Sequence, residues 1–147
     1  MRLLKHALPI LLMSAFLQPL WPEDRGKDGM IMGFLAGDYI LIGKRINSDE
    51  TYRGRASFVY NEKSRRLELT RMVNGITVSG YARLEPVLDG DARVLRIYFE
   101  QDGIEYRGTF LWQADLDNFG RFSGYIYQKD TVPEDPGLEA YFIFNQD

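Results

Sequence analysis

The stretch RRLELTRMVNGITVSGYARLE, residues 65–85, contains the clearest fold signal in the chain. Its first half places apolar side chains at alternate positions: Leu67, Leu69 and Val73. Alternation resumes in Ile76–Glu85, and Asn74-Gly75 stands between the two runs. Both residues of this pair tolerate the positive φ angles of a type I′ turn. The stretch is therefore predicted to form a β-hairpin.

The same alternation extends outward from this hairpin in both directions. About eight runs are separated by turn residues: 38–45, 51–60, 65–73, 76–85, 93–100, 104–112, 121–128 and 138–144. No helical pattern separates them, which favours an antiparallel meander. Closure of such a sheet removes its exposed edges. We therefore predict an all-β fold, a single antiparallel up-and-down barrel of about eight strands, with an open β-sandwich as the alternative.

Glycines recur on the predicted inward face of these runs: Gly43, Gly54, Gly80, Gly108 and Gly124. One interpretation is that they relieve crowding where strands bend, opposite large inward residues such as Phe58, Phe110, Trp112 and Phe142. The other is that they leave a void for a small apolar ligand. Burial of each large side chain stabilises by roughly 1.5–3 kcal/mol, so a filled interior is favoured.

A hollow barrel would have a polar lining that includes Tyr60. The candidate ligand-binding residues are Tyr39, Tyr52, Arg71, Tyr106 and Trp112. Arg71 is the single charged residue that the alternation points inward. Because a buried guanidinium is costly without a partner, Arg71 either meets an inward acid, lies near the rim or binds an anionic ligand.

Composition excludes several kinds of chemistry. The 147 residues carry a net charge of −3 and contain no cysteine, which excludes disulfides, thiolate zinc sites and a cysteine nucleophile. The one histidine, His6, lies in a predicted export segment, so the mature chain would have no imidazole. We predict that the chain has no catalytic residues, binds no metal or cofactor, and is not an enzyme. The acidic balance argues against binding to nucleic acid.

The alternative to a non-enzymatic protein is an enzyme that uses carboxylates. The sequences Asp115-Leu116-Asp117-Asn118 and Asp89-Gly90-Asp91 are interpreted as turns, because they lack the further ligands of a calcium loop. A carboxylate-dependent hydrolase acting on an envelope substrate would use such loop acids.

The N-terminal residues have the pattern of a targeting signal. Arg2 and Lys5 precede an uncharged apolar run, residues 7–17, which is typical of a secretory signal peptide and too short to span a membrane as a helix. We predict a signal peptide over 1–21, a flexible lead-in over 22–36, rich in charge and glycine, and a β-barrel domain over 37–147. The alternatives are an uncleaved anchor or a first core strand. The expected location is periplasmic or secreted, with no stable membrane insertion after cleavage.

Several short motifs in the chain carry a resemblance to a known group of proteins. They are Gly37-x-Tyr39-x-x-x-Gly43, Asn47, Asp49, Tyr52-Arg53-Gly54 and a second Tyr-Arg-Gly at Tyr106-Arg107-Gly108. In these the chain resembles small exported bacterial β-barrel proteins of lipocalin-like or avidin-like, that is calycin, shape. Lipocalins have Gly-x-Trp on their first strand, where this chain has Tyr39. The resemblance implies a barrel fold and an envelope location.

The leading functional hypothesis is a non-enzymatic binding or structural protein of the bacterial envelope. It would recognise a small apolar molecule inside the barrel or an envelope protein on the outer face. Outward tyrosines are the candidates for the second role, since tyrosine is enriched at interfaces: Tyr81, Tyr98, Tyr125 and Tyr127.

Overall fold

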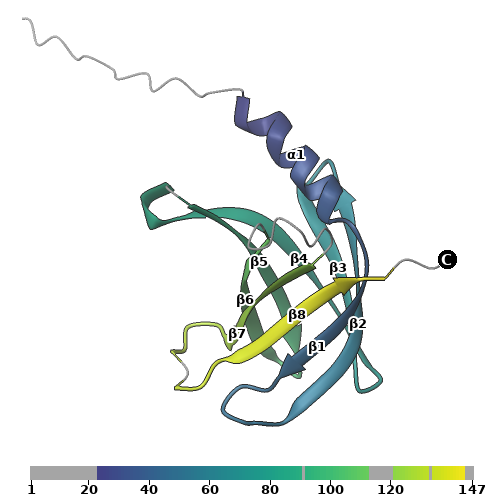
Figure 1. The fold of residues 1–147 in the computed structure, drawn as a ribbon, viewed down its shortest axis with the longest axis vertical. Coiled ribbons are helices and arrows are strands. Elements are labelled where there is room, and N and C mark those ends of the chain that lie inside the picture. The colour runs from purple at the N-terminus through teal and green to yellow at the C-terminus, as the bar shows by residue number, and fades with distance from the viewer. Residues whose placement is uncertain (1–22, 91, 113–120, 133, 145–147) are drawn as a thin grey trace, which may run out of the picture.

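The computed structural model describes residues 23–144, apart from 91, 113–120 and 133. These residues form a closed barrel in which each strand pairs antiparallel with its sequence neighbours and the last strand pairs with the first (Figure 1). The elements are α1 (Glu23–Leu35), β1 (Gly37–Lys44), β2 (Thr51–Asn61), β3 (Arg66–Val73), β4 (Ile76–Val87), a 3-10 turn (Leu88–Gly90), β5 (Ala92–Gln101), β6 (Ile104–Leu111), β7 (Arg121–Gln128) and β8 (Gly137–Ile143). The predicted up-and-down barrel is confirmed, and the sandwich alternative is wrong.

The hairpin that identified the fold is β3–β4. Its last pair is Val73 with Ile76, directly across the turn. Asn74 has a φ of 52° and Gly75 a φ of 79°, as a type I′ turn requires. The turn and the alternation therefore specify the same register.

Helix α1 lies in the segment predicted to be a flexible lead-in, and that part of the prediction is corrected. Met32 and Leu35 are buried against the barrel. The Tyr39 hydroxyl donates a hydrogen bond of 3.0 Å to the Leu35 carbonyl oxygen, and Asp28 forms a two-point ion pair with Arg93. The helix is stabilised by these tertiary contacts, which local composition does not reveal.

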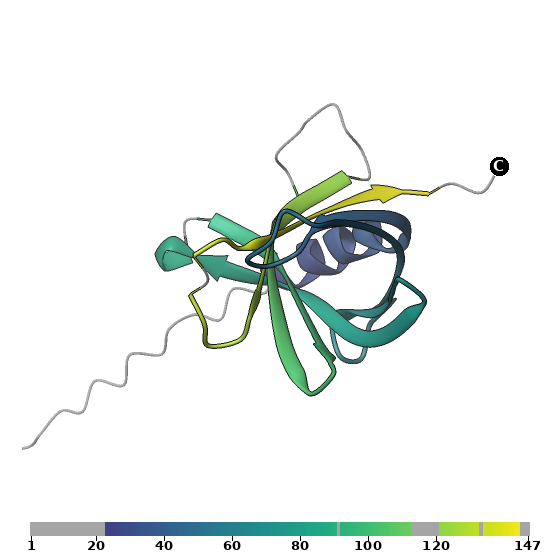
Figure 2. The same ribbon diagram turned by 90° about the horizontal axis from the view of Figure 1, so that it is seen from below.

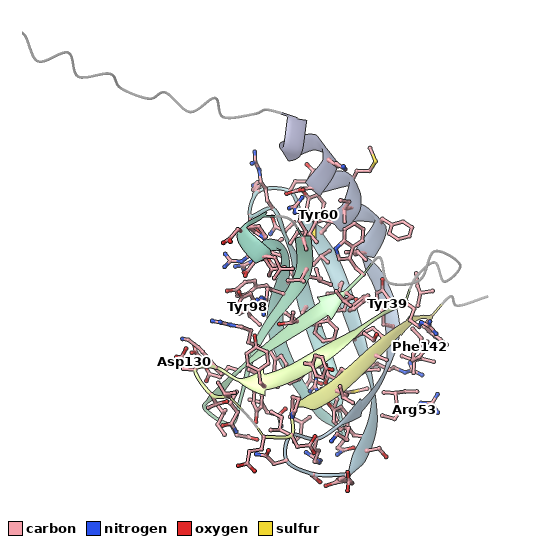
Figure 3. All side chains as sticks on the ribbon, turned by 60° about the vertical axis from the view of Figure 1, so that its left-hand side comes forward. Tyr39, Arg53, Tyr60, Tyr98, Asp130 and Phe142 are labelled. Carbon is pink, nitrogen blue, oxygen red and sulfur yellow. The ribbon has the colours of Figure 1, made fainter. Side chains whose placement is uncertain are left out.

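One end of the barrel is next to α1, as Figures 1 and 2 show from two directions. Tyr60 lies beside the helix (Figure 3), where a Cβ at Gly29 would come within 3.3 Å of the Tyr60 hydroxyl oxygen. Strand direction alternates, so the connections after β1, β3, β5 and β7 lie together at the other end. We call this the open end.

Aromatic rings fill the barrel interior. Five buried rings contact one another: Tyr39, Phe58, Phe110, Phe122 and Tyr141. Phe122 stacks on Tyr141 at a centroid distance of 4.7 Å, and Tyr39 meets Phe58 edge-on at 5.6 Å. Such arrangements suit the quadrupoles of aromatic rings. The filled interior favoured by the sequence is the one observed.

The inward aromatic residue of β8 is Tyr141, and the prediction for Phe142 is wrong. Phe142 points away from the barrel (Figure 3), with the Arg121 guanidinium 5.9 Å from its ring. Tyr141 pairs with Leu41 and with Phe122, both inward residues, and this pairing sets the phase of the strand.

All five predicted glycines face inward, and their neighbours explain the absence of a side chain. At three of them a Cβ would collide with a carbonyl oxygen of the adjacent strand: Gly54, Gly80 and Gly124. At the other two it would collide with the ring of Tyr52 or Phe110: Gly43 and Gly108. The glycines therefore permit close strand approach and leave room for aromatic rings, in agreement with the structural interpretation.

Candidate functional site

An ion pair is buried inside the barrel between β3 and β8. Arg71 and Glu139 are only 5% and 2% exposed, and Nη2 of Arg71 lies 2.5 Å from Oε1 of Glu139. Tyr52 donates a hydrogen bond of 2.5 Å to Oε1, and Tyr141 donates one of 2.6 Å to Oε2. The inward acid, one of the three alternatives for Arg71, is therefore observed. We call these four residues the buried cluster.

Burial and charge fix the protonation states of three members of the buried cluster, Tyr52, Arg71 and Tyr141. Burial, reinforced by the Glu139 carboxylate, raises the pKa of the Tyr52 and Tyr141 hydroxyls above the usual tyrosine value. Burial lowers the pKa of Arg71, but the same carboxylate outweighs it and the pKa is raised overall. At neutral pH both tyrosines are therefore neutral donors and Arg71 is a cation.

The buried cluster leaves one donor without a partner. Among the described residues, Nε of Arg71 makes no hydrogen bond, although it is buried. A buried donor without a partner costs about 1–3 kcal/mol, and a buried ion pair is by itself a weak source of stability. Fold stability alone therefore gives a poor account of Arg71.

A cleft of about 290 Å³ is present at the open end. Its charged and aromatic lining is Lys44, Arg45, Arg71, Tyr52, Phe99 and Tyr106. Phe99 and Tyr106 stack at a centroid distance of 5.0 Å with nearly parallel planes, and the Arg71 guanidinium lies 4.7 Å from the Phe99 ring. We call this the open-end cleft. It joins flat apolar walls to a cation held by the buried cluster.

The structure brings three of the five predicted ligand-binding residues together, because Tyr52, Arg71 and Tyr106 line the open-end cleft. Tyr39 is in the core below α1, where burial raises its pKa to about 12. Trp112 follows β6, which runs away from the open end, and is half-buried against the core. These two residues are not part of the cleft.

Glu139 is the residue that the sequence analysis missed. It lies two positions before Tyr141 and therefore shares its inward face. Alternation through Tyr141 instead of Phe142 would have placed it opposite Arg71.

The alternative of loop carboxylates remains a prediction, because Asp115 and Asp117 lie outside the described residues. Asp89 is in the 3-10 turn with a φ of 55°, consistent with its interpretation as a turn residue. Within the described part of the chain, no group of three or more histidine, cysteine, aspartate or glutamate residues could hold a metal ion. Nor does any helix in that part have the length and hydropathy needed to cross a membrane.

The outer face of β3–β6 has a second cluster of stacked side chains. Tyr81 and Tyr98 stack at a centroid distance of 4.8 Å. The guanidinium of Arg66 lies 4.6 Å from the Tyr81 ring, and that of Arg107 lies 5.5 Å from the Tyr98 ring. Arginine and tyrosine are the residue types enriched at protein interfaces. The predicted outward position of both tyrosines is confirmed.

The fold rests on the strand pairing alone, and the site rests on the contacts described above. Neither the protein-family models nor the curated proteins give a match to this sequence.

Proposed function

We propose that this protein is a non-enzymatic binding protein of the bacterial envelope that holds a small molecule in the open-end cleft. The cleft itself is the observation that supports the proposal, because concave sites with apolar walls and a few polar groups are typical of ligand sites. Its volume of about 290 Å³ suits a small ligand. The envelope location rests on the signal-like N-terminus.

The closed geometry supports a ligand at the open end rather than inside the barrel. Rings fill the interior around Tyr39 and Tyr141, and α1 lies against the opposite end. A ligand that entered the open end would meet the rings of Tyr52, Phe99 and Tyr106 and the Arg71 guanidinium, which all line the cleft.

Native mass spectrometry of the protein purified from the organism that makes it tests this proposal. We expect a retained small molecule. A tryptophan at Ile76, which lines the cleft, should block it, so the Ile76→Trp protein should lose that molecule. Val59 is 61% exposed on the outer face of β2, and Val59→Trp is the matched control that should retain it. Retention by Ile76→Trp, or no retained molecule in the unmodified protein, would overturn the proposal.

A second candidate function is recognition of an envelope protein through the outer cluster around Tyr81 and Tyr98. The stacked pair with its flanking arginines supports it. A stoichiometric partner in the same mass spectrum, lost when Tyr98→Ala is introduced, would favour this function over a ligand-binding one.

A further inference from the structure

The charges that line the open-end cleft all have the same sign. Lys44, Arg45 and Arg71 are its three cations, and none of the described residues that line it is acidic. The whole chain has a net charge of −3, so a cation-lined cleft does not follow from composition. Carboxamide donors complete the polar lining: Asn74, Gln101 and Gln128.

Each cation is oriented by a carboxylate outside the cleft. Lys44 lies 2.6 Å, Arg45 3.0 Å and Arg71 2.5 Å from its partner oxygen: Asp135, Glu50 and Glu139 respectively. The cleft therefore presents the positive end of three ion pairs. Arg71 is also held in place by the hydroxyl of Tyr52, which lies 3.4 Å from Nη2, so its guanidinium is fixed in one orientation before an anion binds.

We infer that the open-end cleft binds a small organic anion, a carboxylate or phosphate monoester with a flat apolar body. This inference rests on the proposed function and adds the ligand class. The anionic group lies at the cationic floor formed by Arg71 with Lys44, where charge-assisted hydrogen bonds are available. The apolar body lies along Phe99 and Tyr106, whose rings are parallel within 11°.

Four matched probes separate the ligand class from the proposed function: benzoate, phenyl phosphate, benzamide and benzylammonium. Each is titrated into isotope-labelled protein, and shifts are followed at Val73, Tyr106 and Gln128, which line the cleft. We expect benzoate or phenyl phosphate to shift these signals at millimolar concentration and to bind at least about tenfold more tightly than benzamide. Benzylammonium should leave them unchanged. The first two probes decide between carboxylate and phosphate.

Two variants test the role of the charges. In Arg71→Met/Glu139→Gln both buried charges are removed together, so no unpaired charge remains. This protein should lose about tenfold of the anion affinity while its weaker benzamide binding is unchanged. Lys44→Gln removes the second cation of the floor without touching the buried cluster and should weaken anion binding about threefold. Arg53→Met, on the exposed outer face of β2, is the control and should bind anions like the unmodified protein.

The two proposals fail in different ways. Cleft shifts from benzamide or benzylammonium equal to those from benzoate would overturn the anionic ligand class and leave the ligand-binding function standing. The anionic ligand class would also be overturned if neither Arg71→Met/Glu139→Gln nor Lys44→Gln changed the anion affinity. If no probe shifts the cleft signals, the ligand class is wrong, and the retained molecule sought by native mass spectrometry decides the function separately.

Discussion

Arg71 and Glu139 place two opposite charges in an interior that is otherwise aromatic and aliphatic. They are the buried charged side chains of the described part of the chain. Taking each charge out of water is costly, and their attraction, with the tyrosine hydrogen bonds, offsets that cost. Each charge therefore depends on the other, which a mutational cycle can measure.

We predict that Glu139→Gln lowers the free energy of unfolding by about 3–5 kcal/mol, because it leaves the Arg71 guanidinium buried without its counter-charge. Arg71→Met/Glu139→Gln should cost less than this single change. Urea unfolding is the measurement. The control is Glu50→Gln at the exposed pair with Arg45, which should cost less than about 1 kcal/mol. A cost for Glu139→Gln no larger than for Glu50→Gln would contradict the prediction.

The buried Tyr39 hydroxyl makes the free energy of unfolding depend on pH, with a sign set by its raised pKa. Burial raises its folded-state pKa from 10.0 to about 12, so the folded protein favours the neutral phenol more than the unfolded chain does. This stability is complete below pH 10 and is lost as the pH rises toward about 12. Tyr52 and Tyr141 have raised pKa values and act in the same direction.

We therefore expect the free energy of unfolding to fall by more than about 1 kcal/mol between pH 10 and 12, measured by urea unfolding at fixed ionic strength. Tyr39→Phe should show a smaller fall over this range, since one titrating group is gone. An unchanged slope in Tyr39→Phe would show that Tyr39 does not contribute to it.

At the scale of elements, the inward glycines set how closely strands approach. A Cβ at Gly124 in β7 would meet the Thr109 carbonyl oxygen and come within 2.7 Å of the Phe110 Cα atom, both backbone atoms of β6. A backbone neighbour cannot move aside without changing the strand spacing. The pairing of β6 with β7 thus depends on a missing side chain.

Gly124→Ala should lower the free energy of unfolding by about 1–3 kcal/mol because of this overpacking. Gly33 in α1 is the matched control, since a Cβ there has no neighbour within 4 Å. Gly33→Ala should raise stability by up to about 1 kcal/mol through helix propensity. Thermal unfolding of both variants checks the two signs. Equal effects would mean that the β6–β7 spacing tolerates a methyl group.

At the scale of the whole molecule, the barrel was predictable because each strand buries one face. Period-two alternation and Asn74-Gly75 therefore located every strand within one or two residues. Helix α1 was not predictable, since its glycines lower helix propensity and only contacts with the barrel end, through Met32 and Leu35, favour it.

The candidate site was half predictable, for a similar reason. Arg71 was found because the alternation of apolar residues in β3 allows only one inward face. In β8 either Tyr141 or Phe142 satisfies alternation, and only pairing with its neighbour strands decides between them. Glu139 was missed with that choice. The open-end cleft needs barrel closure, which brings Lys44 of β1 and Gln128 of β7 to the same site, and no local pattern specifies this.

Closure also bears on the N-terminal segment. β1 pairs with both β2 and β8, so the barrel offers no free edge to a further strand. Export of the apolar run before the barrel therefore stays a prediction from the sequence, where basic residues precede that run.

Expressed in a bacterium with its native N-terminus, the protein should be recovered from the periplasm with a mass that lacks roughly the first 21 residues. Leu11→Glu/Leu12→Glu places two charges in the apolar run, so this variant should stay in the cytoplasm at full mass, with circular dichroism showing the same β-sheet content. Intact mass spectrometry of both fractions is the measurement. A periplasmic or cytoplasmic protein whose mass still includes Met1–Trp21 would mean that the segment is not cleaved.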